Sequence, residues 1–119
     1  MSRLIKRINN ITFAVSNLKE TVSFYENTLG LKKTAEWNNY VMFDVGGMEL
    51  AFEPGGKKGR KEGMPDVFML VDDVDEVYNK LKEKGVKFAT EPKDQQWGGR
   101  TAAFLDPDEN MFVLVHFKK

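Results

Sequence analysis

The fold is decided by the stretch Ile11-Thr-Phe-Ala-Val15, followed by Ser16-Asn17-Leu18, because the chain repeats its pattern 56 residues later. The second copy reads Val67-Phe-Met-Leu-Val71, followed by Asp72-Asp73-Val74. Each apolar, β-rich run predicts a strand, and the polar residues after it are typical of a helix N-cap. Apolar side chains at helical spacing then follow in both copies: Leu18, Val22, Tyr25 and Leu29 in the first, and Val74, Val77, Tyr78 and Leu81 in the second.

Each predicted helix ends at a glycine, Gly30 or Gly85, which suits a left-handed C-terminal cap. These glycines are offset by 55 rather than 56, so the first helix contains one extra residue. A hairpin follows in each copy, joined by Gly46-Gly47 or by the turn-forming segment 106–110. The predicted strands are 32–36, 40–45 and 48–52 in the first copy, and 87–90, 100–105 and 111–117 in the second.

The order strand, helix and three strands predicts an α+β fold of two βαβββ modules within a single domain over residues 1–119. Module one spans about 5–53 and module two about 66–117. Residues 54–65 are rich in Gly, Pro and charge, which indicates a flexible connector; contact of its basic residues with phosphates is the alternative. Two units are too few for a solenoid, so we expect them to close on each other.

Charge and composition favour a small-molecule partner. The chain has 18 basic and 18 acidic residues, so neither nucleic acid nor an anionic membrane surface is an expected partner. It has no cysteine, which excludes disulfides and thiolate chemistry. Neither a leader peptide nor an apolar run of membrane-spanning length is visible, and we therefore expect a cytoplasmic protein.

Several local strings resemble the vicinal oxygen chelate superfamily, which includes glyoxalases, bleomycin-resistance proteins and extradiol dioxygenases. They are Phe24-Tyr25 with Leu29-Gly30-Leu31, the run from Val71 to Val74, Trp97-Gly98, and Asp106-Pro107-Asp108, together with the first-strand pattern. The resemblance covers nearly the whole chain. It implies two modules that form a curved, mixed, mostly antiparallel sheet around a cup-shaped pocket, with the helices outside.

The same resemblance implies where a metal would bind in the metal-dependent members, on two histidines and two carboxylates from four strands. Those positions fall on Asn10, Glu49, Asp66 and Val113, so only Glu49 matches. An amide, two carboxylates and a valine are a poor ligand set for Zn²⁺, Ni²⁺ or Fe²⁺, and we expect no metal cofactor. Weak Mg²⁺ or Ca²⁺ binding by the oxygen atoms is the alternative. His116 is expected to point away from the face of Val113.

If Asn10 and Glu49 face the cup, period-two alternation places a largely apolar set of side chains beside them. Glu49 is then the candidate catalytic group, as a general base, or else a solvated residue or an ion-pair partner of Arg100. Aromatic residues at the rim are suited to stacking on a flat ligand. The candidate ligand-binding residues are Asn10, Thr12, Trp37, Tyr40, Phe68, Leu70, Trp97, Arg100 and Val113.

Two functions remain open on the sequence. The first is a metal-free protein of the bleomycin-resistance kind that binds a small hydrophobic or aromatic organic molecule. The second is an enzyme, a glyoxalase- or epimerase-like lyase or isomerase or a dioxygenase, with an atypical metal site or with Glu49 as the base. In either case a homodimer is expected, both from the prevalence of symmetric dimers and from the resemblance.

Overall fold

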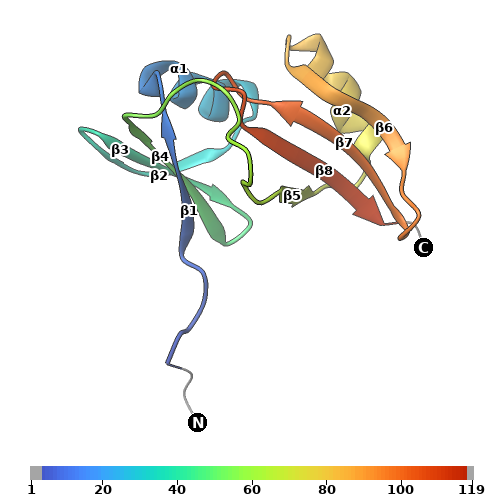
Figure 1. The fold of residues 1–119 in the computed structure, drawn as a ribbon, viewed down its shortest axis with the longest axis horizontal. Helices are drawn as coiled ribbons and strands as arrows, with labels where there is room; N and C mark the ends of the chain where they lie inside the picture. The colour runs from blue at the N-terminus through green and yellow to red at the C-terminus, as the bar shows by residue number, and fades with distance from the viewer. Residues whose placement is uncertain (1–3, 118–119) are drawn as a thin grey trace. The chain divides into compact units, whose positions relative to one another are not determined.

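The computed structural model describes residues 4–117 and divides into two compact units, with the division between Lys57 and Lys58. Each unit contains a four-stranded mixed sheet. The elements of each unit follow in the order strand, helix and three strands (Figure 1). The predicted α+β class and the two βαβββ modules are thus confirmed. The cup that both modules would share stays a prediction.

The first unit has the strand order β1-β4-β3-β2, in which only the β1–β4 pair is parallel. Its aromatic core lies between the helical segment and the sheet: the Tyr25 ring stacks on Phe52 at 4.4 Å, and Phe13 stacks on Phe52 at 5.8 Å. The elements are β1 (Asn10–Val15), α1 (Leu18–Ser23), the π-helix η1 (Phe24–Thr28), β2 (Lys32–Trp37), β3 (Tyr40–Val45) and β4 (Met48–Pro54).

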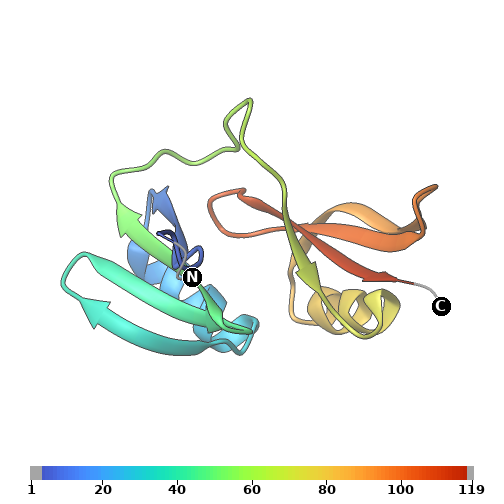
Figure 2. The same cartoon turned by 90° about the horizontal axis from the view of Figure 1, so that it is seen from below.

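The second unit repeats this topology with the order β5-β8-β7-β6, and here the β5–β8 pair is the parallel one. Figure 2 shows α2 lying along one face of the sheet, where the Tyr78 ring meets Phe88 at 4.6 Å. The elements are β5 (Val67–Leu70), α2 (Val74–Glu83), β6 (Lys87–Asp94), β7 (Gly99–Leu105) and β8 (Met111–Phe117).

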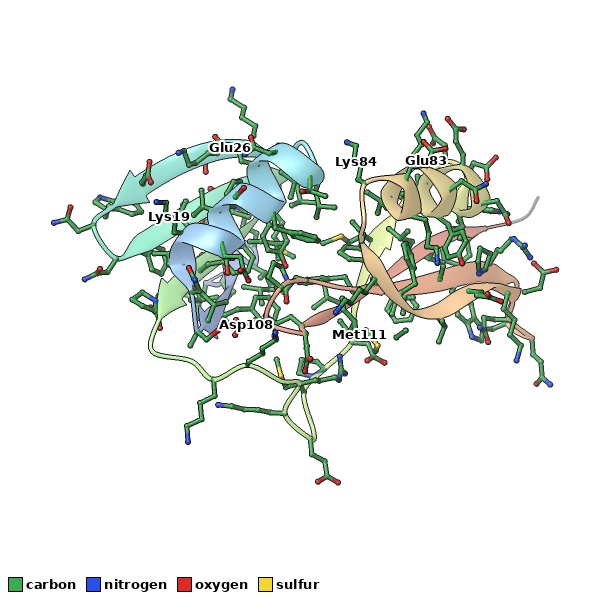
Figure 3. All side chains as sticks on the ribbon, turned by 90° about the horizontal axis from the view of Figure 1, so that it is seen from above. Lys19, Glu26, Glu83, Lys84, Asp108 and Met111 are labelled. Carbon is green, nitrogen blue, oxygen red and sulfur yellow. The ribbon has the colours of Figure 1, made fainter. Side chains whose placement is uncertain are left out.

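Both helices begin and end as the sequence predicts. The Asn17 side chain accepts a hydrogen bond from Glu20 N at 3.0 Å, and Asp73 accepts one from Glu76 N at 3.2 Å. Gly30 and Gly85, with φ of 73° and 89°, follow the two helices. Charged side chains such as Lys19, Glu26 and Glu83 lie on the outer sides of the helical segments (Figure 3).

The extra residue of the first helix is held in η1. Leu29 N donates to Phe24 O at 2.9 Å, a bond to the fifth preceding residue rather than the fourth. The wider turn accounts for the difference between the offsets of 56 and 55. It lets the first helix carry one more residue and still end at a glycine.

Six strand limits differ from the sequence prediction. β1 begins at Asn10 and β7 at Gly99, each one residue earlier than predicted, while β2 ends one residue later, at Trp37, and β4 two residues later, at Pro54. β6 continues to Asp94 instead of ending at Thr90, because its pairing with β7 resumes after an irregular stretch, at Lys93 opposite Thr101. β5 ends at Leu70 rather than at Val71. In residues 4–117, neither helical segment combines the length and apolar character needed to cross a membrane.

Candidate functional site

One face of each sheet carries the helix of its unit, and the opposite face, called here the helix-free face, carries most of the candidate site residues; Arg100 is the exception. In the first unit, Asn10 lies opposite Glu49 and Thr12 lies opposite Ala51 in the parallel β1–β4 register. Alternation sends the neighbouring residues Phe13 and Val15 into the core under α1 and η1. The first helix-free face therefore carries the candidates Asn10, Thr12, Trp37, Tyr40 and Glu49.

Hydrogen bonds join three of these candidates. Asn10 Nδ2 donates to Thr12 Oγ1 at 2.8 Å and to the Tyr40 hydroxyl at 3.1 Å, and Thr12 Oγ1 lies 2.7 Å from that hydroxyl. Trp37 extends the group, with its ring centroid 5.8 Å from that of Tyr40. The first helix-free face is thus a polar network with one exposed aromatic ring beside it.

Glu49 lies beside this network, and its carboxylate accepts a hydrogen bond from the Thr34 hydroxyl. Arg100, the alternative partner of Glu49 considered from the sequence, is held by two carboxylates of its own unit. Arg100 donates through Nε and Nη2 to both oxygens of Asp75, at 2.7 and 2.8 Å, and through Nη1 to Asp94 at 3.1 Å. A fork of this kind is the usual geometry of an arginine–carboxylate pair.

Arg100 lies on the helix-covered face of its sheet, away from Val113. Its partner in the β7–β8 register is His116, whose Nδ1 accepts a hydrogen bond from Val74 N at 2.8 Å, at the beginning of α2. His116 therefore points away from the face of Val113, as alternation predicts. The hydrogen bonds from Arg100 lower the pKa of the Asp75 carboxyl, and those same bonds with Asp75 and Asp94 raise the pKa of the Arg100 guanidinium.

The helix-free face of the second sheet is apolar and aromatic. Phe68 and Leu70 lie in register with Val113 and Val115, and the face continues to Phe117 at the end of β8. The Trp97 ring lies 6.2 Å from Phe68 and 6.0 Å from Phe117. The three rings, Phe68, Trp97 and Phe117, form what is called here the aromatic cluster, and they are 48%, 56% and 59% exposed.

Gly99 holds Trp97 in this position. A Cβ at Gly99 would lie 2.2 Å from Cζ3 of the Trp97 ring, so the indole rests directly on the bare backbone of β7. Phe117 was not among the candidate residues of the sequence. Its spacing of two and four residues from Val115 and Val113 was the signal that placed it on their face.

The positions that correspond to metal ligands in the superfamily do not fit a transition metal. Both sides of the Asn10 amide are already used, since its oxygen accepts from Asn9 Nδ2 at 2.8 Å while its nitrogen donates to Thr12 and Tyr40. Asp66 accepts from Arg60 at 2.8 Å, and Val113 has no donor atom. Within residues 4–117, no three His, Cys, Asp or Glu side chains are grouped closely enough to hold an ion.

The sequence and the fold both have close counterparts among known proteins. Over 91% of its length the chain is 35% identical to YraH of Bacillus subtilis, of which it covers 96%. Over the same share it is 27% identical to the metallothiol transferase FosB of Lysinibacillus sphaericus, of which it covers 80%. A crystal structure of a glyoxalase/bleomycin resistance protein/dioxygenase superfamily member from Sphaerobacter thermophilus matches with a TM-score of 0.81 and 32% identity, covering 95% of this chain and 98% of that one.

A family model decides the assignment, because it matches residues 7–114, and so includes both βαβββ modules and the connector. The resemblance noted in the sequence motifs is thereby confirmed. The chain belongs to the Glyoxalase/Bleomycin resistance protein/Dioxygenase superfamily.

Proposed function

We propose that this protein binds a small hydrophobic or aromatic organic molecule without a catalytic metal, as a member of the bleomycin-resistance kind. The observation that supports the proposal is the aromatic cluster: the rings of Phe68 and Phe117 each lie within 6.2 Å of the Trp97 ring on one face, and all three are about half exposed. Exposed apolar groups of this kind mark interaction sites more often than plain surface. Flat apolar molecules gain both buried area and ring contacts there.

The neighbouring candidate residues extend the proposed site on the same face. Leu70 is 74% exposed and offers apolar area next to the rings, and Val113, which is 9% exposed, lies beside Phe68 in register. The first unit carries candidate contacts of its own: Trp37 offers an aromatic ring, and the network of Asn10, Thr12 and Tyr40 offers hydroxyl and amide groups. We propose that these residues contribute less to the affinity for the ligand than the aromatic cluster does.

The two tryptophans allow a direct test, since Trp37 lies in β2 and Trp97 in the turn between β6 and β7, and each gives its own indole N–H signal in heteronuclear NMR. The Trp37→Phe and Trp97→Phe variants assign the signals. Titration with uncharged flat compounds, beginning with 2-naphthamide, is expected to shift the Trp97 signal saturably. If no compound of such a panel moved either indole signal, the proposed function would be wrong.

An enzyme that uses Glu49 as a general base is the second candidate. Its support is that Glu49 lies on a helix-free face, next to hydroxyl and amide groups that can orient a polar substrate. The relative FosB is a metallothiol transferase, whereas the corresponding positions here fit a transition metal poorly. Glu49→Gln is expected to change the affinity for 2-naphthamide by less than about twofold. If a turnover assay finds product formation that Glu49→Gln abolishes, the enzyme replaces the binding protein as the function.

A homodimer is part of the proposal as well. Its support is that dimers with two-fold symmetry are the commonest assemblies of soluble homo-oligomers. Light scattering with size-exclusion chromatography measures the mass directly, and we expect twice the chain mass of 13.6 kDa. A mass equal to one chain at all concentrations would contradict the dimer.

A further inference from the structure

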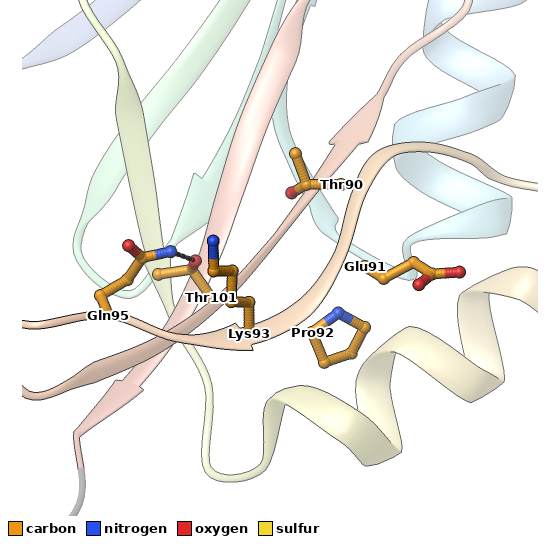
Figure 4. Close-up of a pocket in the computed structure, with 6 residues that line it drawn as sticks. All are labelled: Thr90, Glu91, Pro92, Lys93, Gln95 and Thr101. Atoms are coloured by element: carbon orange, nitrogen blue, oxygen red, sulfur yellow. Dashed lines mark hydrogen bonds between the residues drawn. The ribbon is translucent and has the colours of Figure 1, made fainter.

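The second unit contains a hollow of about 440 Å³ beside β6 (Figure 4). It lies where the end of β6 runs past β7. Its walls come from β6, from the turn after it and from one residue of β7. The lining residues are Thr90, Glu91, Pro92, Lys93, Gln95 and Thr101.

An irregularity in β6 creates this hollow. The register with β7 shifts between Thr90 and Lys93, so Glu91 and Pro92 have no partner in the pairing with β7. Pro92 lacks an N–H, which suits a place where the ladder is interrupted. The Thr90 side chain takes over one ladder bond, because its Oγ1 accepts from Ala103 N at 2.9 Å. Bulges of this type are frequent beside functional sites, where they redirect side chains.

Hydrogen-bond donors converge in the hollow. Lys93 is the register partner of Thr101, so both side chains leave the sheet on the same face, and Figure 4 shows the Lys93 nitrogen turned toward Thr101 and Gln95. Gln95 Nε2 donates one N–H to Thr101 Oγ1 at 3.0 Å and has a second to offer. Thr101 is 7% exposed, which fixes this donor pair in the wall of the sheet.

The hollow contains a positive charge, the ammonium group of Lys93, that no neighbouring carboxylate among the described residues neutralises. No ion pair involves Lys93 in the part of the chain that the structure describes. Glu91 lines the hollow too, but its carboxylate points away from Lys93 (Figure 4). An ammonium group, an amide N–H and two hydroxyls around one hollow form a set that suits the two oxygens of a carboxylate.

The hollow borders the aromatic cluster. Thr101 is two residues after Gly99 on the same face of β7, and the Trp97 ring lies on Gly99. We propose that the ligand is an aromatic carboxylate, with its ring against the aromatic cluster and its carboxylate in the hollow on Lys93, Gln95 and Thr101. This inference rests on the proposed function and adds the class of ligand to it.

The test compares 2-naphthoate with 2-naphthamide, which have the same ring system and differ in the charge of one group. Affinities are measured by calorimetry and by the Trp97 indole signal. We expect the unmodified protein to bind the carboxylate about tenfold more tightly than the amide. Lys93→Gln should reduce this preference to less than about twofold and Lys93→Arg should retain it. Lys87→Gln serves as the matched control, because Lys87 is an exposed lysine of the same strand outside the hollow.

Salt gives a second measurement that needs no variant. Raising NaCl from about 20 mM to about 500 mM should weaken the binding of the carboxylate and leave that of the amide nearly unchanged. Equal affinities for the two compounds, or a preference that survives Lys93→Gln, would overturn the carboxylate inference while the proposed function stands. If neither compound shifts the Trp97 signal, it is the proposed function that fails.

Discussion

The two units have the same strand order and the same helix-covered core, but their helix-free faces differ. In the first unit this face carries Asn10, Thr12 and Tyr40, joined by hydrogen bonds of 2.7 to 3.1 Å. In the second unit this face carries the three exposed rings of the aromatic cluster, with Trp97 between the other two, and a hollow whose lining includes Lys93. One topology therefore supports a polar network in one copy and an apolar surface in the other.

This difference indicates that the fold depends on the side chains under the helices, whereas the candidate site depends on those of the opposite face. Buried aromatic pairs recur in both units, as Tyr25 with Phe52 and Phe104 with Phe112 show. The alternate positions on the same strands point away from those rings. They are free to differ, and this is where function is carried in folds that host many activities.

The largest expected effect is a loss of stability when the aromatic core, a feature of both units, is disrupted. Tyr25→Ala removes a fully buried ring that stacks on Phe52 at 4.4 Å, and we expect it to lower the free energy of unfolding by about 3–5 kcal/mol. Urea denaturation followed by circular dichroism measures the change. The control, Lys19→Ala on the exposed side of α1, should cost less than about 0.5 kcal/mol. A cost below about 1 kcal/mol for Tyr25→Ala would show that the ring is not part of a packed core.

Two glycines differ in what an added side chain would meet: backbone atoms, which cannot move easily, at Gly56, and a side chain, which can move, at Gly99. A Cβ at Gly56 would lie 2.1 Å from the backbone oxygen of Ala14, so Gly56→Ala should cost about 1–3 kcal/mol. A Cβ at Gly99 would meet only the far edge of the Trp97 ring, which can swing away, and Gly99→Ala should cost less than about 1 kcal/mol while it shifts the tryptophan emission. Thermal unfolding and fluorescence check both. A larger loss for Gly99→Ala than for Gly56→Ala would reverse the comparison.

Substitution of each tryptophan in turn tests which helix-free face binds the ligand. Trp37 and Trp97 are similarly exposed, at 59% and 56%, so neither alanine variant should unfold the protein. Trp97→Ala is expected to weaken the binding of 2-naphthamide about tenfold, because it removes the centre of the aromatic cluster. Trp37→Ala should weaken it less than about twofold. Equal losses would place the binding on both faces.

The smallest expected effect is the pH dependence of the ion pair in the second unit. Arg100 lowers the pKa of Asp75 in the folded chain, so the carboxyl keeps its charge to a lower pH there than in the unfolded chain. The pair therefore stabilises the fold above the usual pKa of an aspartate, about 4, and this stabilisation is lost as the pH falls through the lowered value. Melting curves in acid should fall slightly more steeply for the unmodified protein than for Asp75→Asn. Parallel curves would mean that the pair adds nothing measurable to stability.

Much of the fold could be predicted from the sequence, because the repeat with an offset of 56 combines strand, cap and helix patterns that are local. Alternation also placed Thr12 with Asn10, and Val113 with Phe68, on shared sheet faces, as the registers of the two sheets show. The partners of Arg100 could not be predicted, since they depend on how α2 lies over β7. The hollow at Lys93 depends on a register shift in β6, which no local pattern indicates.

The π-helix of the first unit explains how its helix can be one residue longer than that of the second unit and still pack in the same way. A residue inserted into an ordinary α-helix rotates every later side chain by about 100° about the axis, which would move Leu29 off the face it shares with Tyr25. In η1 the insertion is absorbed within one wide turn, between Phe24 and Leu29, and the helix still ends at Gly30. Removing one residue from Phe24–Thr28 would make the two helices equal in length and let the two strand–helix segments, up to Gly30 and Gly85, align without a gap. The insertion therefore changes the length of the first helix without changing which of its side chains pack on the sheet.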